Sequence, residues 1–198
     1  MTFRVALTFD AEHPDRPHHS GGTEGALDLL DNERVKATFF IQGRWAEAYP
    51  EVARSIADGG HLIGNHSHYH ARMPLLSAAG LVSDVRAAER AIRAATGVDP
   101  RPWFRCPFGA GTDDPGVLSG LERLGYRETR WHVEGFDWRP GRRGLGMARS
   151  MLDGAVRNGD GAVLMLHPWT TATGLGLACL VHGLRAAGAE FVRLDGLE

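Results

Sequence analysis

The sequence predicts a single α/β domain in which a mostly parallel sheet curls toward a barrel, with helices on its outside. Seven short, apolar, β-prone segments alternate with segments that repeat apolar residues at helical spacing. No internal repeat, low-complexity tract or linker-like stretch divides the chain, so residues 1–198 are expected to form one domain. An open doubly wound sheet is the alternative architecture.

Each expected strand is a short apolar run that ends at turn residues or charged residues. The strands are expected at residues 5–9, 36–41, 61–64, 102–105, 126–133, 161–166 and 190–194. Apolar stripes at helical spacing lie between them, and glycine follows several of these stripes, as is usual where helices stop. The helices are expected at residues 22–32, 45–56, 81–95, 117–124, 144–157 and 175–187. Residues 11–19 contain prolines and are expected to form a loop.

Composition excludes several classes of protein. Lys and Arg total 22 against 24 Asp and Glu, and no basic stripe of the kind that nucleic-acid binders need is present. No apolar run approaches the length of a membrane span. The two cysteines, Cys106 and Cys179, form no CxxC pair, which is typical of a reducing compartment. Because no signal peptide is evident, a cytoplasmic protein is expected.

Two histidines provide the first functional signal. His66 and His70 are four residues apart, so on a helical turn both imidazoles would project from one face and could bind one cation. They follow the expected strand at 61–64, and the carboxyl ends of strands are where α/β folds place their active sites. Taken alone, this spacing also fits histidines on a solvated loop.

Further polar residues follow the other expected strands: Asp10, Glu12, Arg105, Asp137 and His167. Each has a structural explanation by itself, but in a parallel fold all would gather with the two histidines at one face. Two imidazoles and a carboxylate leave a position open for water on a tetrahedral cation, and a second carboxylate can act as general base. A histidine could protonate the leaving group, and Arg105 could orient the base. The set predicts metal-assisted hydrolysis.

The chain resembles the polysaccharide deacetylases, also called the NodB-homology or carbohydrate esterase family four, over nearly its whole length. Five motifs occur in the family's order: Thr8-Phe9-Asp10 (TFDD), His66–His70 (H(S/T)xxH), Arg105–Gly109 (RxPYG), Trp131–Trp138 (WxxDxxDW) and Leu164–His167 (LxLH). The resemblance implies a distorted (β/α)-barrel of about seven parallel strands. It also implies removal of an acyl group, commonly N-acetyl, from an amino sugar or related small molecule or oligosaccharide.

The resemblance further implies a role for each matching residue. Asp10 would be the general base, tethered by Arg105, and His167 the general acid, oriented by Asp137. His66 and His70 would bind the metal, most simply Zn²⁺, with Co²⁺, Mn²⁺ or Ni²⁺ as alternatives. The remaining assignments are Phe108 for an oxyanion-binding N–H, Trp138 and Met165 for the pocket walls, and Ser67 as a brace of the histidine loop.

The chain departs from the family pattern at the third metal ligand. Ala11 stands where a second aspartate is usual, and Glu12 fits a variant with an acid two residues after the base. Positions 10 and 12 can face the same way past the end of a strand. The alternatives are His13, water or no metal at all, as in relatives that open cyclic amides. A loop with His13, Pro14, His18 and His19 replaces the family's usual continuation, which leaves the choice of substrate open. A non-catalytic sugar-binding relative is a separate alternative. Cys106 is expected to pack rather than to act as a nucleophile.

Overall fold

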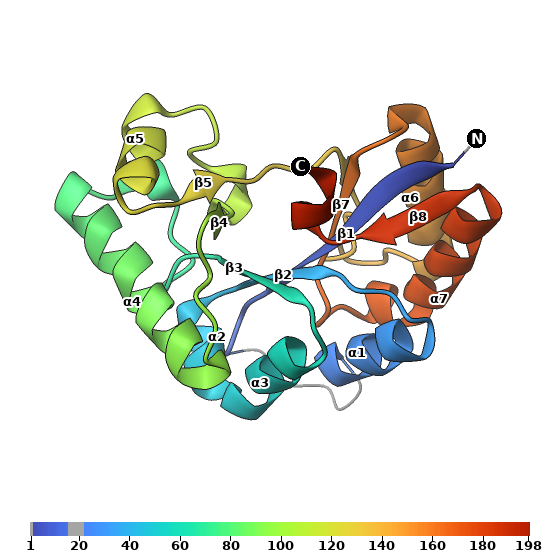
Figure 1. Cartoon of the computed structure of the whole chain (residues 1–198), viewed down its shortest axis with the longest axis horizontal. Helices are drawn as coiled ribbons and strands as arrows, with labels where there is room; N and C mark the ends of the chain where they lie inside the picture. The colour runs from blue at the N-terminus through green and yellow to red at the C-terminus, as the bar shows by residue number, and fades with distance from the viewer. Residues whose placement is uncertain (1, 16–21) are drawn as a thin grey trace.

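A computed structural model of the chain describes residues 2–15 and 22–198, and it contains one sheet flanked by helices (Figure 1). The strands are β1 (Phe3–Ala11), β2 (Thr38–Ile41), β3 (Leu62–Asn65), β4 (Trp103–Phe104), β5 (Arg127–Glu128), β6 (Val133–Glu134), β7 (Ala162–Leu166) and β8 (Ala189–Val192). The α-helices are α1 (Thr23–Asn32), α2 (Gly43–Ala48), α3 (Pro50–Asp58), α4 (Ala78–Thr96), α5 (Pro115–Arg123), α6 (Gly144–Asn158) and α7 (Thr171–Ala186). Short 3₁₀ turns are η1 (Met73–Leu75), η2 (Pro107–Gly109) and η3 (Leu194–Leu197).

The strands form a curled, parallel sheet, as expected for a distorted barrel. Seven strands follow the order β5-β4-β3-β2-β1-β7-β6, β8 pairs with β1, and every strand pair in the described part of the chain is parallel. Strand β1 is central because three strands pair with it. β8 pairs with Phe3–Ala6 and β2 with Thr8–Ala11, while β7 pairs with Val5–Phe9.

Alternation along β1 divides the core into two parts. Val5, Leu7 and Phe9 face the helices, and Phe9 stacks on Phe39 of β2 with ring centroids 4.9 Å apart. Ala6 faces the interior of the curled sheet with a smaller apolar group. Because side chains alternate along a strand, Asp10 projects on the same side as Ala6. The sequence alternation of β1 therefore directs Asp10 into the barrel interior.

Two expected elements differ from the structure. The single helix expected at 45–56 is divided into α2 and α3 at Tyr49, whose φ and ψ are −130° and 58°. Pro50 follows, and the residue before a proline avoids helical geometry, whereas proline itself is well suited to the first helical turn. The break is thus encoded by Pro50.

The single strand expected at 126–133 is instead two strands at opposite ends of the sheet. β5 pairs with β4, β6 pairs with β7, and residues 129–132 run between the two ends (Figure 1). The pairing partners, which are remote in sequence, decide this division. The strand order places the opening of the barrel between β5 and β6.

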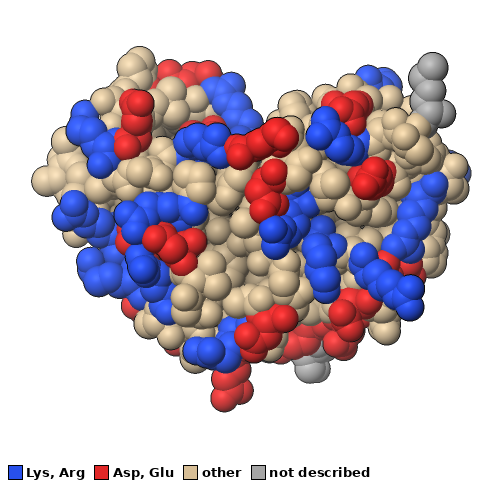
Figure 2. All heavy atoms as spheres, in the orientation of Figure 1, with Lys and Arg blue, Asp and Glu red and all other residues tan. Residues whose placement is uncertain are grey.

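The outer surface carries charges of both signs, and Figure 2 shows acidic and basic side chains interspersed on one face. In the described part of the chain, no helix has both the length and the apolar character needed to cross a membrane.

Candidate active site

Most of the polar residues that follow the strands line one cleft at the carboxyl ends of the strands, with a volume of about 470 Å³. Arg105 and Asp137 are not in its lining and contact Asp10 and His167, respectively. Asp10 is the penultimate residue of β1, and Glu12 follows the strand directly. His66 comes immediately after β3, Arg105 after β4 and His167 after β7. The cleft is lined by Asp10, Glu12, His13, His66, His70, Arg72, Phe108, Trp131, Glu134, Phe136, Trp138, Met165, His167 and Trp169.

Glu12, His66 and His70 form a cluster with the composition of a metal site. Each offers one ligand atom, and these atoms all lie within 4.8 Å of one another. Glu12 Oε2 is 3.3 Å from His66 Nε2 and also contacts His70 Nε2. The His66 Nδ1–H donates to the carbonyl of Arg105 over 2.9 Å, which turns Nε2 toward the cluster. Two imidazoles and one carboxylate fit a Zn²⁺ or a similar divalent cation.

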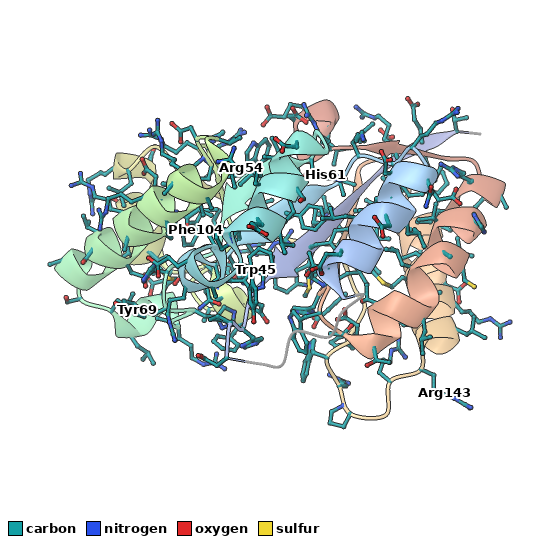
Figure 3. The ribbon with its side chains drawn as sticks, turned by 90° about the horizontal axis from the view of Figure 1, so that it is seen from below. Trp45, Arg54, His61, Tyr69, Phe104 and Arg143 are labelled. Carbon is teal, nitrogen blue, oxygen red and sulfur yellow. The ribbon has the colours of Figure 1, made fainter. Side chains whose placement is uncertain are left out.

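The two histidines do not lie on a helical turn, so that part of the sequence prediction is wrong. Ser67 and His70 have left-handed φ values of 66° and 56°, and the loop after β3 folds back on itself. Tyr69 lies on this loop, and Phe104 on β4 precedes Arg105 (Figure 3). The bend of the loop, and not the periodicity of a helix, brings the two imidazoles together.

Side chains next to the loop hold this bend. Asn65 Oδ1 accepts the Ser67 N–H over 2.9 Å, and the two carboxylate oxygens of Asp84 accept the N–H groups of His68 and Tyr69, each over 3.0 Å. Asp84 projects from α4 and is buried. Within the described residues the Ser67 hydroxyl has no hydrogen-bond partner, so the brace expected from Ser67 is supplied by Asn65 and Asp84 instead.

Asp10 is paired with a buried arginine. Arg105 Nη1 lies 2.8 Å from Asp10 Oδ1 and 2.9 Å from the Thr8 hydroxyl, and Arg105 Nε donates to the carbonyl of Thr129. The guanidinium lies 4.0 Å from the centroid of the Phe40 ring. Breaking a buried pair of this kind leaves an uncompensated charge, which is strongly destabilising. Asp10 is therefore held in one orientation, with Oδ2 3.8 Å from His66 Nε2.

His167 is held by direct hydrogen bonds to Asp137. Asp137 Oδ1 accepts from His167 Nδ1 over 2.8 Å, and Oδ2 accepts from the His167 N–H over 2.7 Å. The hydroxyls of Thr170 and Thr173, at the start of α7, also donate to Oδ2. Nδ1 is therefore occupied, and Nε2 is the nitrogen directed to the cleft, 3.8 Å from Glu12 Oε1.

His167, which is paired with Asp137, and His70, which contacts Glu12, differ in the direction of their pKa shifts. Burial lowers the pKa of His167, but the hydrogen bond and charge of Asp137 outweigh it and raise that pKa to about 9. For Asp137, burial raises the pKa while the bond from His167 lowers it, and the net direction is down. His70 has a lowered pKa, chiefly through burial. At neutral pH, His167 therefore carries a proton on Nε2, whereas His70 is neutral as a metal ligand must be.

Aromatic and apolar residues form the walls of the cleft. The three residues predicted to contact substrate all line it, with Met165 buried and Phe108 and Trp138 exposed. Phe108 packs edge-on against His70, with centroids 4.4 Å apart, and its φ of 59° turns the backbone at this point. Sequence reasoning missed Trp169, which packs against both His13 and His167. Its place directly after His167-Pro168 is the one signal that points to it.

The sequence also singles out Cys106 and the histidine-rich loop after β1. Cys106 is buried, and burial raises the pKa of its thiol, so it lacks the character of a nucleophile, as expected. Of the residues in the histidine-rich loop, His18 and His19 lie outside the described residues. His13 contacts Glu12 Oε1 over 2.7 Å.

A carboxylate, a protonated histidine and a metal-type cluster in one cleft are the groups that water-activating hydrolases use. The sequence model of the polysaccharide deacetylase family matches residues 2–129, and the chain belongs to this family. The family resemblance and the fold class are thereby confirmed.

Relatives and solved structures agree with this membership. The chain is 31% identical over 194 residues to the peptidoglycan-N-acetylglucosamine deacetylase PgdA of Listeria monocytogenes, covering 98% of this chain and 38% of PgdA. It is 34% identical over 166 residues to a chitooligosaccharide deacetylase of Bradyrhizobium, covering 84% and 71% of the two chains. The chain thus spans about two fifths of the length of PgdA.

Among solved structures, a family 4 carbohydrate esterase from Streptomyces lividans in complex with acetate has a TM-score of 0.81 and 28% identity, covering 96% of this chain and 91% of that chain. A CE4 family pseudoenzyme from Bacillus anthracis has a TM-score of 0.87 and 26% identity, covering 99% and 65%. The same fold therefore occurs with and without activity, and the residues in the cleft must decide between the two.

Proposed function

We propose that the chain is a divalent-metal-dependent N-deacetylase that removes acetyl groups from amino sugars, as free small molecules or within oligosaccharides. The observation that carries this proposal is the joint presence in one cleft of the Asp10–Arg105 pair, the Asp137–His167 pair and the Glu12, His66, His70 cluster. Binding a sugar alone requires neither a base nor an acid.

The cluster would hold the cation through Glu12, His66 and His70, with Zn²⁺ as the first candidate. When bound, such a cation supplies a Lewis acid that makes water acidic near neutral pH and polarises the acyl carbonyl. Asp10, oriented by Arg105, accepts a proton from the attacking water. Its free oxygen lies beside the cluster, 3.8 Å from His66 Nε2, which is where a water would have to be deprotonated.

His167, which follows the neighbouring strand β7, completes the reaction. Its Nε2 donates a proton to the amine nitrogen as the amide bond breaks, and Asp137 stabilises the imidazolium until then. The backbone N–H of Phe108 would stabilise the oxyanion, and Met165 and Trp138 would surround the acetyl methyl group. These roles follow the positions of the residues around the cleft.

The proposal is tested by measuring both the zinc content of the protein and its release of acetate. The purified protein, loaded with zinc, is incubated with N-acetylglucosamine oligomers, and released acetate and new free amines are measured. Zinc content is measured in parallel by elemental mass spectrometry, with about one ion per chain expected for one three-ligand site. Asp10→Asn should lower the rate of release about 10²- to 10⁴-fold. Asp31→Asn changes an exposed acid elsewhere and should leave the rate unchanged.

Three outcomes would contradict the proposal. Undiminished activity after exhaustive chelation would favour a metal-independent hydrolase of cyclic amides. Oligosaccharide binding without release of acetate would favour a non-catalytic relative. The similarity of this fold to that of a CE4 family pseudoenzyme is the reason to test for this outcome. Full activity of Asp10→Asn would mean that another group is the base.

A further inference from the structure

The two oxygens of the Glu12 carboxylate have different surroundings. Oε2 faces His66 and His70, the other members of the cluster. Oε1 accepts a hydrogen bond from His13 Nε2 over 2.7 Å, and His167 Nε2 lies 3.8 Å from the same oxygen. The His13 contact thus leaves a single oxygen directed at the metal position.

His13 is itself fixed by the backbone and by Gln42. Its φ is 64°, a left-handed conformation that costs energy in most residues other than glycine. The His13 N–H donates to Gln42 Oε1 over 3.0 Å, and Gln42 Nε2 donates to the carbonyl of His68 over 3.2 Å. One buried side chain therefore links the loop after β1 to the loop after β3, which together carry all members of the cluster.

The ring of His13 is also restrained. It packs edge-on against His70, with centroids 5.2 Å apart, and against Trp169 at 5.3 Å. His13 is not part of the group whose ligand atoms lie within 4.8 Å of one another. Its Nε2 is occupied by Glu12 Oε1, so it contacts a ligand rather than serving as one.

A hydrogen bond to Glu12 from outside the cluster would reduce the conformational freedom of its long side chain. Glu12 has one more rotatable bond than aspartate, so more conformational freedom must be lost when its carboxylate is held in place. Ala11, the preceding residue, offers no ligand atom. Hydrogen bonds from outside the ligand set orient ligating carboxylates and strongly influence metal affinity.

We propose that His13, anchored by Gln42, is a positioning residue that fixes the Glu12 carboxylate so that Glu12 can act as the third metal ligand. This inference rests on the metal site of the proposed function. His13 Nε2–H holds Oε1, the anchored backbone sets the position of the ring, and Oε2 remains directed between His66 and His70.

The experiment compares three variants of the full chain by zinc affinity, measured by competition with a chromogenic chelator. His13→Gln keeps an N–H donor near the position of Nε2, and His13→Ala removes it. Both retain a β-carbon at the left-handed position, so they share the backbone penalty. His182→Gln, an exposed histidine on α7, controls for adventitious zinc binding. Thermal unfolding of the metal-free proteins establishes that each variant is folded.

We expect His13→Ala to weaken zinc binding about 10- to 100-fold, as for other outer supports of metal ligands. His13→Gln should restore affinity to within a few-fold of the unmodified protein, and His182→Gln should match it. Equal, large losses in both His13 variants would mean that His13 binds the metal directly. Unchanged affinity in His13→Ala would mean that Glu12 needs no support, and both results overturn the inference. An unmodified protein that binds no zinc would refute the metal site itself and this inference with it.

Discussion

Replacing Asp137 by asparagine removes a negative charge from beside His167 while keeping the size of the side chain. Burial lowers the pKa of His167, and Asp137 is the largest influence that raises it. In the metal-free protein we therefore expect the pKa of His167 to fall from about 9 to its ordinary 6.5 or below. The direct measurement is an NMR titration of the His167 ring in the unmodified protein and in Asp137→Asn.

The same shift predicts how stability depends on pH. A pKa raised from 6.5 to about 9 on folding corresponds to about 3 kcal/mol of stabilisation, at about 1.4 kcal/mol for each pKa unit. Because the folded-state pKa of His167 is the higher one, this stabilisation is complete below pH 6.5. It declines between pH 6.5 and about 9 and is absent above that range. The lowered pKa of Asp137 reflects the same interaction and is not added to it.

Urea unfolding of Asp137→Asn at several pH values tests this expectation. The pH-dependent part of the loss should be about 3 kcal/mol at pH 6 and should vanish above pH 9. The hydrogen bonds from Thr170 and Thr173 add a part that does not change over this range. A loss of equal size at pH 6 and pH 9.5, or an unchanged titration of His167, would refute the reasoning.

Three further predictions concern other parts of the chain. Asp10→Asn should lower kcat by about 10²- to 10⁴-fold, as expected for loss of a general base, with zinc content unchanged, and a normal rate would exclude that role. Gly144→Ala should cost about 1–3 kcal/mol in urea unfolding, because its β-carbon would lie 2.8 Å from backbone atoms of α7. Gly146→Ala, with nothing within 4 Å, is the matched control and should be neutral or stabilising. A thiol reagent should label exposed Cys179 in the native protein and buried Cys106 only after unfolding, and early labelling of Cys106 would contradict its burial.

Much of the fold could be predicted because the information is local. The apolar runs that form β1, β2, β3 and β7 are each continuous in the sequence and end close to where the strands end. The parallel arrangement then brings the residues after these strands to one face. For this reason the strand pattern alone predicts that Asp10, His66 and Arg105 lie together, and all three are buried at the carboxyl ends of their strands.

What the sequence did not contain is the set of contacts between distant segments. The bend of the histidine loop depends on Asp84, which lies on α4 and is sixteen residues from the N–H that it accepts. The link made by Gln42 joins two loops that are far apart in the chain. Residues 126–133 have the pattern of one strand because that pattern is local, whereas their partners β4 and β7 lie at opposite ends of the sheet.

The central position of β1 has a consequence for dynamics. Its amides and carbonyls are shared among three partner strands, whereas β5 and β6 are two-residue strands at the ends of the sheet. In native-state hydrogen exchange, we expect β1 to exchange only when the whole domain unfolds, and the two end strands to exchange through local opening. Asp10 lies in β1 and Glu12 follows it directly. We therefore expect the distance between the two carboxylates to stay constant when the end strands at the opening of the barrel open locally.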